Sequence, residues 1–432
     1  MKVESWGRYP RIPQKGVPLT WADEVQSVTR AHTESGFLPF GNGRSYGDVC
    51  LSDSGLAVLM RGLNRFISFD KTTGCLVAEA GITLGEILSC IVPAGWFLPV
   101  VPGTRLASVG GAIANDVHGK NHHVRGTFGC HVKRLWLWRE GCVSECSEAH
   151  NPELFRATIG GLGLTGVILR AELSLMPVAN EQIDTVTHRF ETLSDFFTLA
   201  DAYDKSHEYG VAWVDCLSRG KQKGRGVYFA GRHAEYRSEI DTRQFQLTFP
   251  VMPPVSLVNR LSLKAFNEVY WRTKPASPAQ DRSSYLNYFF PLDGILHWNR
   301  MYGVRGFQQY QCVIPDAAAA DAMSEMFDAI AGAHSGSFLA VLKKCSNISS
   351  PGLLSFPTAG TSLALDFPNT NGLSALLDRL DAITRAAGGR LYPAKDAHMS
   401  AADFQQAYPA WKQLETLRDP AICSRFWRRV TS

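Results

Sequence analysis

Long apolar runs and paired cysteine motifs are both missing from this sequence. The best apolar stretch, residues 91–103, is interrupted by three prolines and two glycines, so it is not expected to span a membrane. Residues 1–16 lack the apolar core of a signal peptide. Of the ten cysteines only Cys142 and Cys146 lie close together, and no CxxC pair occurs. These absences predict a cytosolic protein with reduced, unpaired thiols.

A strong excess of one charge is missing too. The formal net charge of +4 is spread along the chain, which gives little support to nucleic-acid binding. This net charge is still compatible with a mildly basic face that meets an anionic substrate or a membrane surface. Hydrophobic residues make up 45% and charged residues 19%, a composition that excludes a disordered chain. The length of 432 residues suits two domains with sizeable cores.

The composition of the chain and the kind of segments it predicts change near Pro177. Before it, short strand-like and helix-like segments alternate between residues 20 and 175. After it, glycine becomes rarer and aromatic strand-like segments appear, at 211–217, 307–315 and 361–367, with helices predicted at 316–333 and 372–387. This pattern predicts an α+β protein. The stretch 273–284 is rich in Pro, Ser and Ala and is expected to be a mobile loop.

Two glycine-rich loops stand out in the first half, 41-GNGRSYGD-48 and a longer one from Pro102 to His123. Each follows a predicted strand, and glycine lets backbone N–H groups approach an anion such as a pyrophosphate. One such loop alone favours a simple turn about as strongly as a binding site, whereas two favour a nucleotide site. Gly161, Gly163 and Gly166 also match G-x-G-x-x-G, but a helix precedes and a strand follows, which excludes a Rossmann loop.

The segment 118-HGKNHH-123 raises the question of a metal site. His118 and His122 have i,i+4 spacing, but Gly119 separates them, and His122 and His123 should diverge. No metal is therefore predicted. A polar loop with satisfied histidines remains a good interpretation for His122 and His123, while His118 and Lys120 are interpreted as functional because they end a predicted nucleotide loop.

A family resemblance connects these segments. It is carried by WGR at 6–8, GRSYGD at 43–48, PGTR at 102–105, VGGAIA at 109–114, HGKNHH at 118–123, GLTG at 163–166 and GGRLYPAKD at 388–396. In these motifs the chain resembles FAD-dependent oxidases of the vanillyl-alcohol-oxidase type, and within them the decaprenylphosphoryl-β-D-ribose 2′-oxidase family. The resemblance implies a two-subdomain FAD-binding domain plus an α+β substrate (cap) domain with an antiparallel sheet. It divides the chain into an FAD-binding domain at 1–177, a substrate domain at 178–387 and a C-terminal segment at 388–432 that returns to the first domain.

The resemblance also implies the cofactor site. Its residues would be Gly41, Asn42, Gly43, Arg44, Ser45, Tyr46, Gly103, Ser108, Val109, Gly110, Gly111, Asn115, Asp116, Val117, His118, Ile168 and Tyr392. Many members of the wider group attach FAD covalently through a histidine, and Arg44 occupies that position here. Since arginine cannot form a histidyl link, non-covalent FAD is expected.

The substrate side follows from the same resemblance. The catalytic residues would be Lys395, His118 and Tyr392, and the substrate-binding residues Lys120, Gln309, Gln311, Lys343 and Lys395. Gln309 and Gln311 alternate along a predicted strand, so their side chains should share one face; by pattern alone that face would be solvated. Lys395 could likewise be an exposed lysine in a turn. A lysine serves as proton acceptor near neutral pH only if burial or a nearby cation lowers its pKa.

The implied activity is the oxidation of the 2′-hydroxyl of polyprenylphosphoryl-β-D-ribose to the 2-keto sugar. An NAD(P)H-dependent short-chain reductase would complete the epimerisation to arabinose for a cell-envelope arabinan. The enzyme would lie peripherally on the inner membrane, on its cytoplasmic face or, as the sequence leaves open, its periplasmic face. Oxidation of a soluble sugar, alditol or aldonolactone is the alternative, as is a metal-dependent or purely binding protein that keeps the fold without flavin. Ser362, Ala364 and His398 depart from the family pattern and leave the identity of sugar and lipid open.

Overall fold

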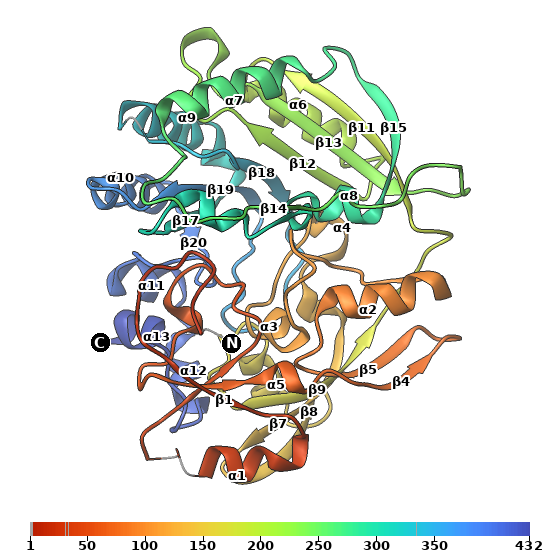
Figure 1. Cartoon of the computed structure of the whole chain (residues 1–432), viewed down its shortest axis with the longest axis vertical. Helices are drawn as coiled ribbons and strands as arrows, with labels where there is room; N and C mark the ends of the chain where they lie inside the picture. Colours follow the sequence, from red (N-terminus) through yellow and green to blue (C-terminus); the bar gives the residue numbers. More distant parts are fainter. Residues whose placement is uncertain (1–2, 31, 33, 334) are drawn as a thin grey trace.

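Two sheets organise the N-terminal half of the protein, whose computed structural model describes residues 3–30, 32, 34–333 and 335–432. One is parallel, in the order β1 (Lys15–Pro18), β3 (Leu56–Leu59), β2 (Leu38–Phe40). The other is antiparallel, in the order β4 (Phe66–Asp70), β5 (Cys75–Glu79), β9 (Val167–Ser174), β7 (Val132–Arg139), β8 (Cys142–Ser147). Both lie in the lower part of Figure 1.

Short helices connect these strands. Helix α2 (Leu84–Ile91) begins at a capping box, in which Thr83 Oγ1 accepts from the Glu86 N–H and the Glu86 carboxylate accepts from the Thr83 N–H. Its apolar face is buried in the N-terminal core. Helix α3 (Val109–Ala114) and helix α5 (Pro152–Thr158) follow. Strand β6 (Trp96–Phe97) is only two residues long, because the prolines that follow cannot donate to a ladder.

An antiparallel sheet of eight strands fills the other half, in the upper part of Figure 1. Its order is β15 (Ala279–Ser284), β11 (Gln182–Phe190), β13 (Gly226–His233), β12 (Tyr209–Val214), β18 (Val341–Cys345), β19 (Gly360–Pro368), β17 (Phe307–Ile314), β20 (Arg390–Leu391). Helices α6 (Leu193–Tyr203), α9 (Asp316–Gly332) and α10 (Leu373–Ala386) cover one face. The α+β class is thereby confirmed.

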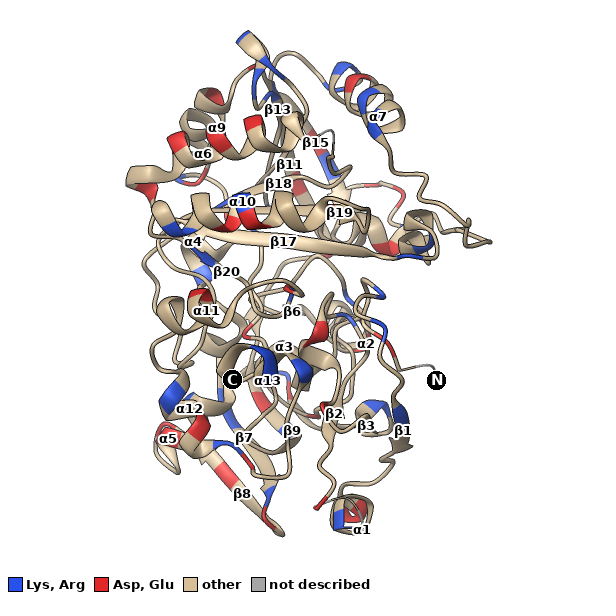
Figure 2. Ribbon diagram, turned by 90° about the vertical axis from the view of Figure 1, so that its left-hand side faces the viewer, with Lys and Arg blue, Asp and Glu red and all other residues tan. Residues whose placement is uncertain are grey.

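The opposite face of this sheet looks toward the N-terminal half and toward helix α7 (Arg260–Arg272). Figure 2 shows α7 on the other side of the large sheet from α6 and α9. Residues 279–284, predicted as part of a mobile loop, form edge strand β15 paired with β11. Their polar composition suits an edge strand that is only half covered, and pairing outweighs their weak intrinsic strand preference. Within the described ranges, no helix is both long and apolar enough to cross a bilayer.

The C-terminal segment crosses from one half to the other. After β20 the chain forms α11 (Ala401–Ala407), α12 (Trp411–Leu417) and α13 (Arg425–Thr431), which lie beside the N-terminal half in Figure 1. The Arg429 guanidinium of α13 bonds the carboxylates of Asp48 at 2.8 Å and Asp396 at 2.9 Å. Both carboxylates are buried, so one cation joins the first glycine loop to the segment that contains Lys395. The domain boundaries at 177 and 388 stay predictions.

Replacing Arg429 by Met should lower the free energy of unfolding by about 3–5 kcal/mol, because two buried carboxylates lose their partner. Urea unfolding followed by tryptophan fluorescence measures this change. Arg428→Met is the matched control: Arg428 is largely exposed and pairs with Asp53, so its loss should cost less than about 1 kcal/mol. Equal stability losses in the two variants would contradict the inference that Arg429 holds Asp48 and Asp396 together.

Candidate active site

Two adjoining cavities lie between the halves of the molecule. The inner cavity is lined by both glycine loops and, at one end, by His118, Tyr392 and Lys395. The outer cavity extends from there past Tyr46, Gln309 and Asp366 to the residues around Trp298. The two share the residues Asn42, Gly43, Arg44, Pro102, Gly103, Thr104, Gln311, Lys343 and Lys395. Two of the shared residues are lysines, Lys343 and Lys395, which we call the lysine pair. A ligand in the inner cavity can therefore meet a second ligand, bound in the outer cavity, beside this pair.

The first glycine loop follows β2 and turns sharply. Gly43 adopts a positive φ of 61°, which residues with a Cβ atom avoid. A Cβ atom at Gly41 would lie 2.4 Å from Ser108 Oγ of the second loop, so the two loops approach each other closely. The hydrogen bonds of the described residues use none of the backbone N–H groups at positions 41–45. These N–H groups form a cradle suited to the oxygens of an anion.

The second loop continues into α3. Ser108 caps this helix, and the Gly110 N–H donates to the Ala80 carbonyl at 2.7 Å, which fixes the helix against the antiparallel sheet. A Cβ atom at Gly103 would meet nothing within 4 Å, so this position faces open space in both cavities. Asn115 donates to the Gly111 carbonyl, while its buried Oδ1 has no partner among the described residues.

These features fit a flavin dinucleotide. The inner cavity offers the backbone N–H donors of the first glycine loop, an Asn115 oxygen without a partner among the described residues, and the rings of His118 and Tyr392. Most residues predicted to hold the cofactor line it: Gly41, Asn42, Gly43, Arg44, Ser45, Gly103, Ser108, Gly110, Gly111, Asn115, Val117, His118, Ile168 and Tyr392. Tyr46 lines the outer cavity instead.

Three predicted site residues lie behind the cavity walls. Val109 is buried in the N-terminal core, and Asp116 accepts hydrogen bonds from the Gly129 N–H, Ser350 and Ser355, so its carboxylate ties two segments together. Lys120, expected at the substrate, donates to the Tyr288 carbonyl and lies 4.2 Å from the centre of that ring. Burial together with the cation of Lys343 lowers the Lys120 pKa to about 7.

The three histidines of residues 118–123 point in different directions. His122 Nδ1 accepts from the Ser346 N–H at 3.2 Å, and His123 Nε2 lies 3.4 Å from the His207 carbonyl oxygen. Only His118 of the three lines the inner cavity. No cluster of three His, Cys, Asp or Glu side chains that could hold a metal ion occurs in the parts of the chain that the structure describes.

His118 is buried between aromatic rings. Its ring centre lies 5.4 Å from that of Tyr392 and 5.5 Å from that of Phe356. Gln311 Nε2 lies 3.1 Å from His118 Nε2, and since the amide nitrogen donates, the neutral ring carries its proton on Nδ1. Burial and the nearby Lys343 cation hold the His118 pKa well below its usual value. The buried Nδ1 has no protein partner among the described residues and is free to donate to a ligand.

Lys395 lies where the two cavities join. Its Nζ is 3.9 Å from the centre of the Tyr46 ring. Removal from bulk water lowers the Lys395 pKa from 10.5 to about 7; the Asp366 carboxylate opposes this shift and the Lys343 ammonium reinforces it. A lysine in this state exchanges a proton readily at neutral pH. Tyr392 is fixed by its hydroxyl, which donates to the Asn115 carbonyl at 2.8 Å.

Asp366 is a residue of this site that the sequence did not predict. It is fully buried on β19, accepts a hydrogen bond from Gln309 Nε2, and leaves Oδ2 unpartnered among the described residues. Burial raises its pKa to about 7. The signal was an acidic residue within the apolar strand 361–368, where an unpaired charge is costly.

The alternation along β17 and β19 directs the polar residues to one face. Gln309 and Gln311 both line the outer cavity, as the spacing predicts, and the residues between them pack into the main core. Gln311 also lies 3.3 Å from Ser362 Oγ, and Ala364 pairs with Gln311 across the strands. His398, in contrast, pairs with Asp378 at 2.8 Å and lines neither cavity.

Arg44 bridges the two cavities. Its guanidinium carbon lies 4.3 Å from the centre of the Trp6 ring, a stacking arrangement that arginine favours. Burial lowers its pKa, and its Nε has no partner among the described residues. The side chain therefore presents a fixed cation with an unused donor beside the first glycine loop.

Comparisons with known proteins agree with this geometry. A family model described as an FAD binding domain matches residues 17–140. Decaprenylphosphoryl-beta-D-ribose oxidase of Mycolicibacterium smegmatis is 34% identical, over 97% of this chain and 94% of its own length. An uncharacterized protein of Streptomyces coelicolor is 34% identical over 78% of this chain and 95% of its own length. L-Gulonolactone oxidase of Bos taurus is 28% identical, over 48% of this chain and 47% of its own length.

The pKa of Lys395 can be measured without any turnover. The rate at which an amine-reactive acylating reagent modifies Lys395, followed by peptide mass spectrometry, should be half-maximal near pH 7. Asp366→Asn should move this midpoint to lower pH, since the carboxylate that favours the ammonium is lost. Lys343→Met should move it to higher pH, since a repelling cation is lost. The exposed Lys412 serves as an internal control, and a Lys395 midpoint equal to that of Lys412 would contradict the assignment.

Proposed function

Because this chain belongs to the decaprenylphosphoryl-ribose oxidase family of FAD-binding proteins, we propose that it oxidises the 2′-hydroxyl of a polyprenylphosphoryl-β-D-ribose to the 2-keto sugar. It is an FAD-dependent oxidoreductase. The observation that carries the proposal for the substrate is the pair Lys343 and Lys395 at the junction of the two cavities. Such a pair suits a ligand that brings both a phosphate and a hydroxyl group to one point.

The protein residues divide the work of the oxidation. When bound, FAD supplies the acceptor for the hydride that leaves the carbinol carbon. Neutral Lys395 accepts the hydroxyl proton, so the alcohol loses a hydride and a proton and becomes a ketone. A lysine with a pKa near 7 is half deprotonated at neutral pH, whereas an ordinary lysine is almost fully protonated. The Tyr46 ring lies next to Lys395 Nζ and limits the directions in which this amine can point.

The remaining polar groups would orient the sugar. Gln309 and Gln311 present amides into the outer cavity, and Asp366 fixes the Gln309 amide. His118 Nδ1 would donate to a ligand oxygen in the inner cavity. Lys343 is the phosphate partner: its pKa is lowered by desolvation, and an incoming anion would restore its charged form. Lys120 lies apart from both cavities, so a role for it would require movement of its side chain.

The cofactor is proposed to be held without a covalent bond. Arg44 stands in the first glycine loop where a histidyl link would need an imidazole, and its guanidinium is occupied in stacking on Trp6. The predicted cofactor residues would hold FAD through backbone N–H groups, Asn115 and Tyr392.

Acid precipitation of the purified yellow protein tests this point. The flavin colour should stay in the supernatant, because denaturation removes every non-covalent contact. Free FAD added to flavin-stripped protein before precipitation controls for trapping in the pellet. Colour that remains with the washed pellet would show a covalent link.

The proposed reaction also implies a partner enzyme and a location in the cell. A 2-keto sugar must be reduced at the same carbon to complete an inversion, and an NAD(P)H-dependent short-chain reductase supplies that chemistry. A lipid-linked substrate resides in a membrane, so peripheral contact with the inner membrane is part of the proposal. We assign the cytoplasmic face, with the periplasmic face as the alternative.

Oxidation of a soluble sugar, alditol or aldonolactone is the second candidate. It is favoured by the similarity to L-gulonolactone oxidase, which covers only about half of the chain. The lysine pair favours the phosphorylated substrate, because an uncharged lactone offers nothing to neutralise it.

Turnover of a short-chain polyprenylphosphoryl ribose against L-gulono-1,4-lactone decides between the two. We expect oxidation of the phosphoribose alone, with kcat/KM rising as pH passes through about 7 and Lys395 loses its proton. Lys395→Met should lower kcat roughly 10²–10⁴-fold while FAD remains bound. Lys343→Met should raise KM for the phosphoribose more than it lowers kcat. Preferential oxidation of the lactone would refute the lipid-linked substrate.

A further inference from the structure

Exposed apolar side chains are concentrated in one stretch of the chain. The described residues with large exposed hydrophobic side chains include a group between positions 245 and 269, which we call the apolar rim: Phe245, Leu247, Val251, Met252, Val255, Leu257, Leu261, Phe266 and Val269. Leu261 is 80% exposed and Phe245 is 77% exposed. Water-soluble proteins seldom gather so many exposed apolar groups unless another surface covers them.

Helix α7 is apolar on its outer side as well as its inner side. Leu263, Asn267 and Trp271 face the sheet and are buried. Leu261, Ala265 and Val269 have the spacing i, i+4, i+8, which aligns them along the exposed side. Figures 1 and 2 both show α7 at the surface of the upper half. The helix therefore has a continuous apolar strip that the fold leaves uncovered.

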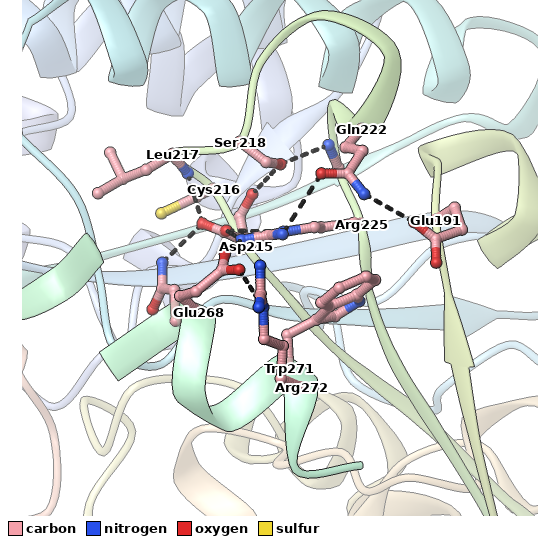
Figure 3. Close-up of polar contacts among 12 residues, drawn as sticks. Glu191, Asp215, Cys216, Leu217, Ser218, Gln222, Arg225, Glu268, Trp271 and Arg272 are labelled. Atoms are coloured by element: carbon pink, nitrogen blue, oxygen red, sulfur yellow. Dashed lines mark hydrogen bonds and ion pairs between the residues drawn. The ribbon is translucent and has the colours of Figure 1, made fainter. Parts of the chain in front are cut away.

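A buried polar network prevents α7 from turning this strip inward. Arg225 pairs with Asp215, which directly follows strand β12, at 3.0 Å and with Glu268 of α7 at 2.6 Å (Figure 3). Asn267 Nδ2 donates to Asp215 at 2.6 Å, and Trp271 Nε1 donates to the Phe190 carbonyl at 3.2 Å. Rotation of α7 would break these contacts and leave buried charged groups without partners. The exposure of the strip is therefore built into the fold.

The apolar rim continues into the mouth of the outer cavity. Met252 lines that cavity, as does Leu296 of strand β16 (Ile295–Leu296), which pairs with strand β14 (Leu247–Thr248) within the rim. Arg300 donates to the Phe249 carbonyl at 3.0 Å and so holds the rim against the cavity wall. A surface that covers the apolar rim would therefore lie next to the outer cavity, which leads to Lys343 and Lys395.

The charge of this stretch indicates what kind of surface it meets. From Asp241 to Lys274 the sequence has five Lys or Arg residues and two acidic residues, Glu268 and Asp241, which pairs with Arg243. Glu268 is paired with Arg225, so the cations Arg260 and Lys264 beside the apolar strip are not offset locally. Apolar groups flanked by cations are the signature of a surface that lies on anionic lipid headgroups.

We propose that the apolar rim and the outer strip of α7 insert into an anionic lipid bilayer, which orients the outer cavity toward the membrane. This inference deepens the proposed function, and rests on it in one respect: a lipid-linked substrate would enter the cavity along the rim without passing through water. Its prenyl chain would stay in the bilayer while the phosphate and the sugar reach Lys343 and Lys395.

Flotation of the FAD-loaded protein with vesicles tests the surface. We expect binding to vesicles of phosphatidylglycerol and phosphatidylcholine that weakens with added salt, and much weaker binding to phosphatidylcholine alone. The double variant Leu261→Ser/Val269→Ser should bind roughly tenfold more weakly or worse, because two inserted side chains are lost. The double variant Arg260→Gln/Lys264→Gln should lose most of the preference for phosphatidylglycerol.

Ile67→Ser/Val143→Ser is the matched control, since it removes two apolar side chains that are 47% and 55% exposed from strands β4 and β8 of the other half. It should bind vesicles like the unchanged protein. Equal binding by the α7 variant and the unchanged protein would overturn the proposal. So would a lipid-free dimer, seen by sedimentation, that the α7 variant abolishes, because a second copy would then be the occupant.

Activity separates this proposal from the function on which it rests. The Leu261→Ser/Val269→Ser variant should oxidise a water-soluble short-chain phosphoribose normally and lose at least about half of its rate on vesicle-embedded substrate. A protein that oxidises the soluble compound but does not bind vesicles would keep the function and refute the membrane surface. A protein that binds vesicles through α7 but oxidises neither compound would keep the surface and refute the function.

Discussion

The pairing of Arg429 with Asp48 and Asp396 holds together the parts of the molecule on which the site depends. Asp48 ends the first glycine loop, and Asp396 follows Lys395 directly in sequence. Around this ion pair the two segments are in backbone contact: the Tyr46 N–H donates to the Ala394 carbonyl, and a Cβ atom at Gly47 would lie 1.6 Å from the Asp396 carbonyl oxygen. The position of Lys395 over Tyr46 follows from this contact, and with it the junction of the two cavities.

Electrostatics then gives the junction its chemical character. Lys343 and Lys395 are both withdrawn from bulk water, and Asp366 is the buried carboxylate that partly offsets them. Desolvation lowers the affinity of each amine for a proton, and the Lys343 cation lowers that of Lys395 further. The junction therefore contains both a base that works at neutral pH and a site that favours an anion. Neutral His118, held by Gln311, adds a donor without adding a charge. One arrangement thus serves both substrate affinity and proton transfer.

Local patterns in the sequence predicted the parts of this site that depend on local geometry. The alternation of Gln309 and Gln311 along one strand is a short-range feature of this kind, and the structure contains it. The partnership of Lys395 with Asp366 was not foreseen, since it depends on the pairing of β17 with both β19 and β20. Lys120 was predicted at the substrate because it lies next to His118 and its loop in sequence, but its side chain turns toward Tyr288. Strand β15 was missed because its composition is that of a loop and its partner strand begins almost a hundred residues earlier.

The large antiparallel sheet has a consequence for how this protein can change over evolutionary time. Along β19, Ser362, Ala364 and Asp366 face the ligand side, while the residues between them are buried against the helices on the other side. Because alternate positions belong to different faces, substitutions that reshape the sugar pocket need not disturb the core. Substrate preference can therefore drift among descendants of one gene while thermal stability is preserved. Ser362 and Ala364 lie at positions of this kind.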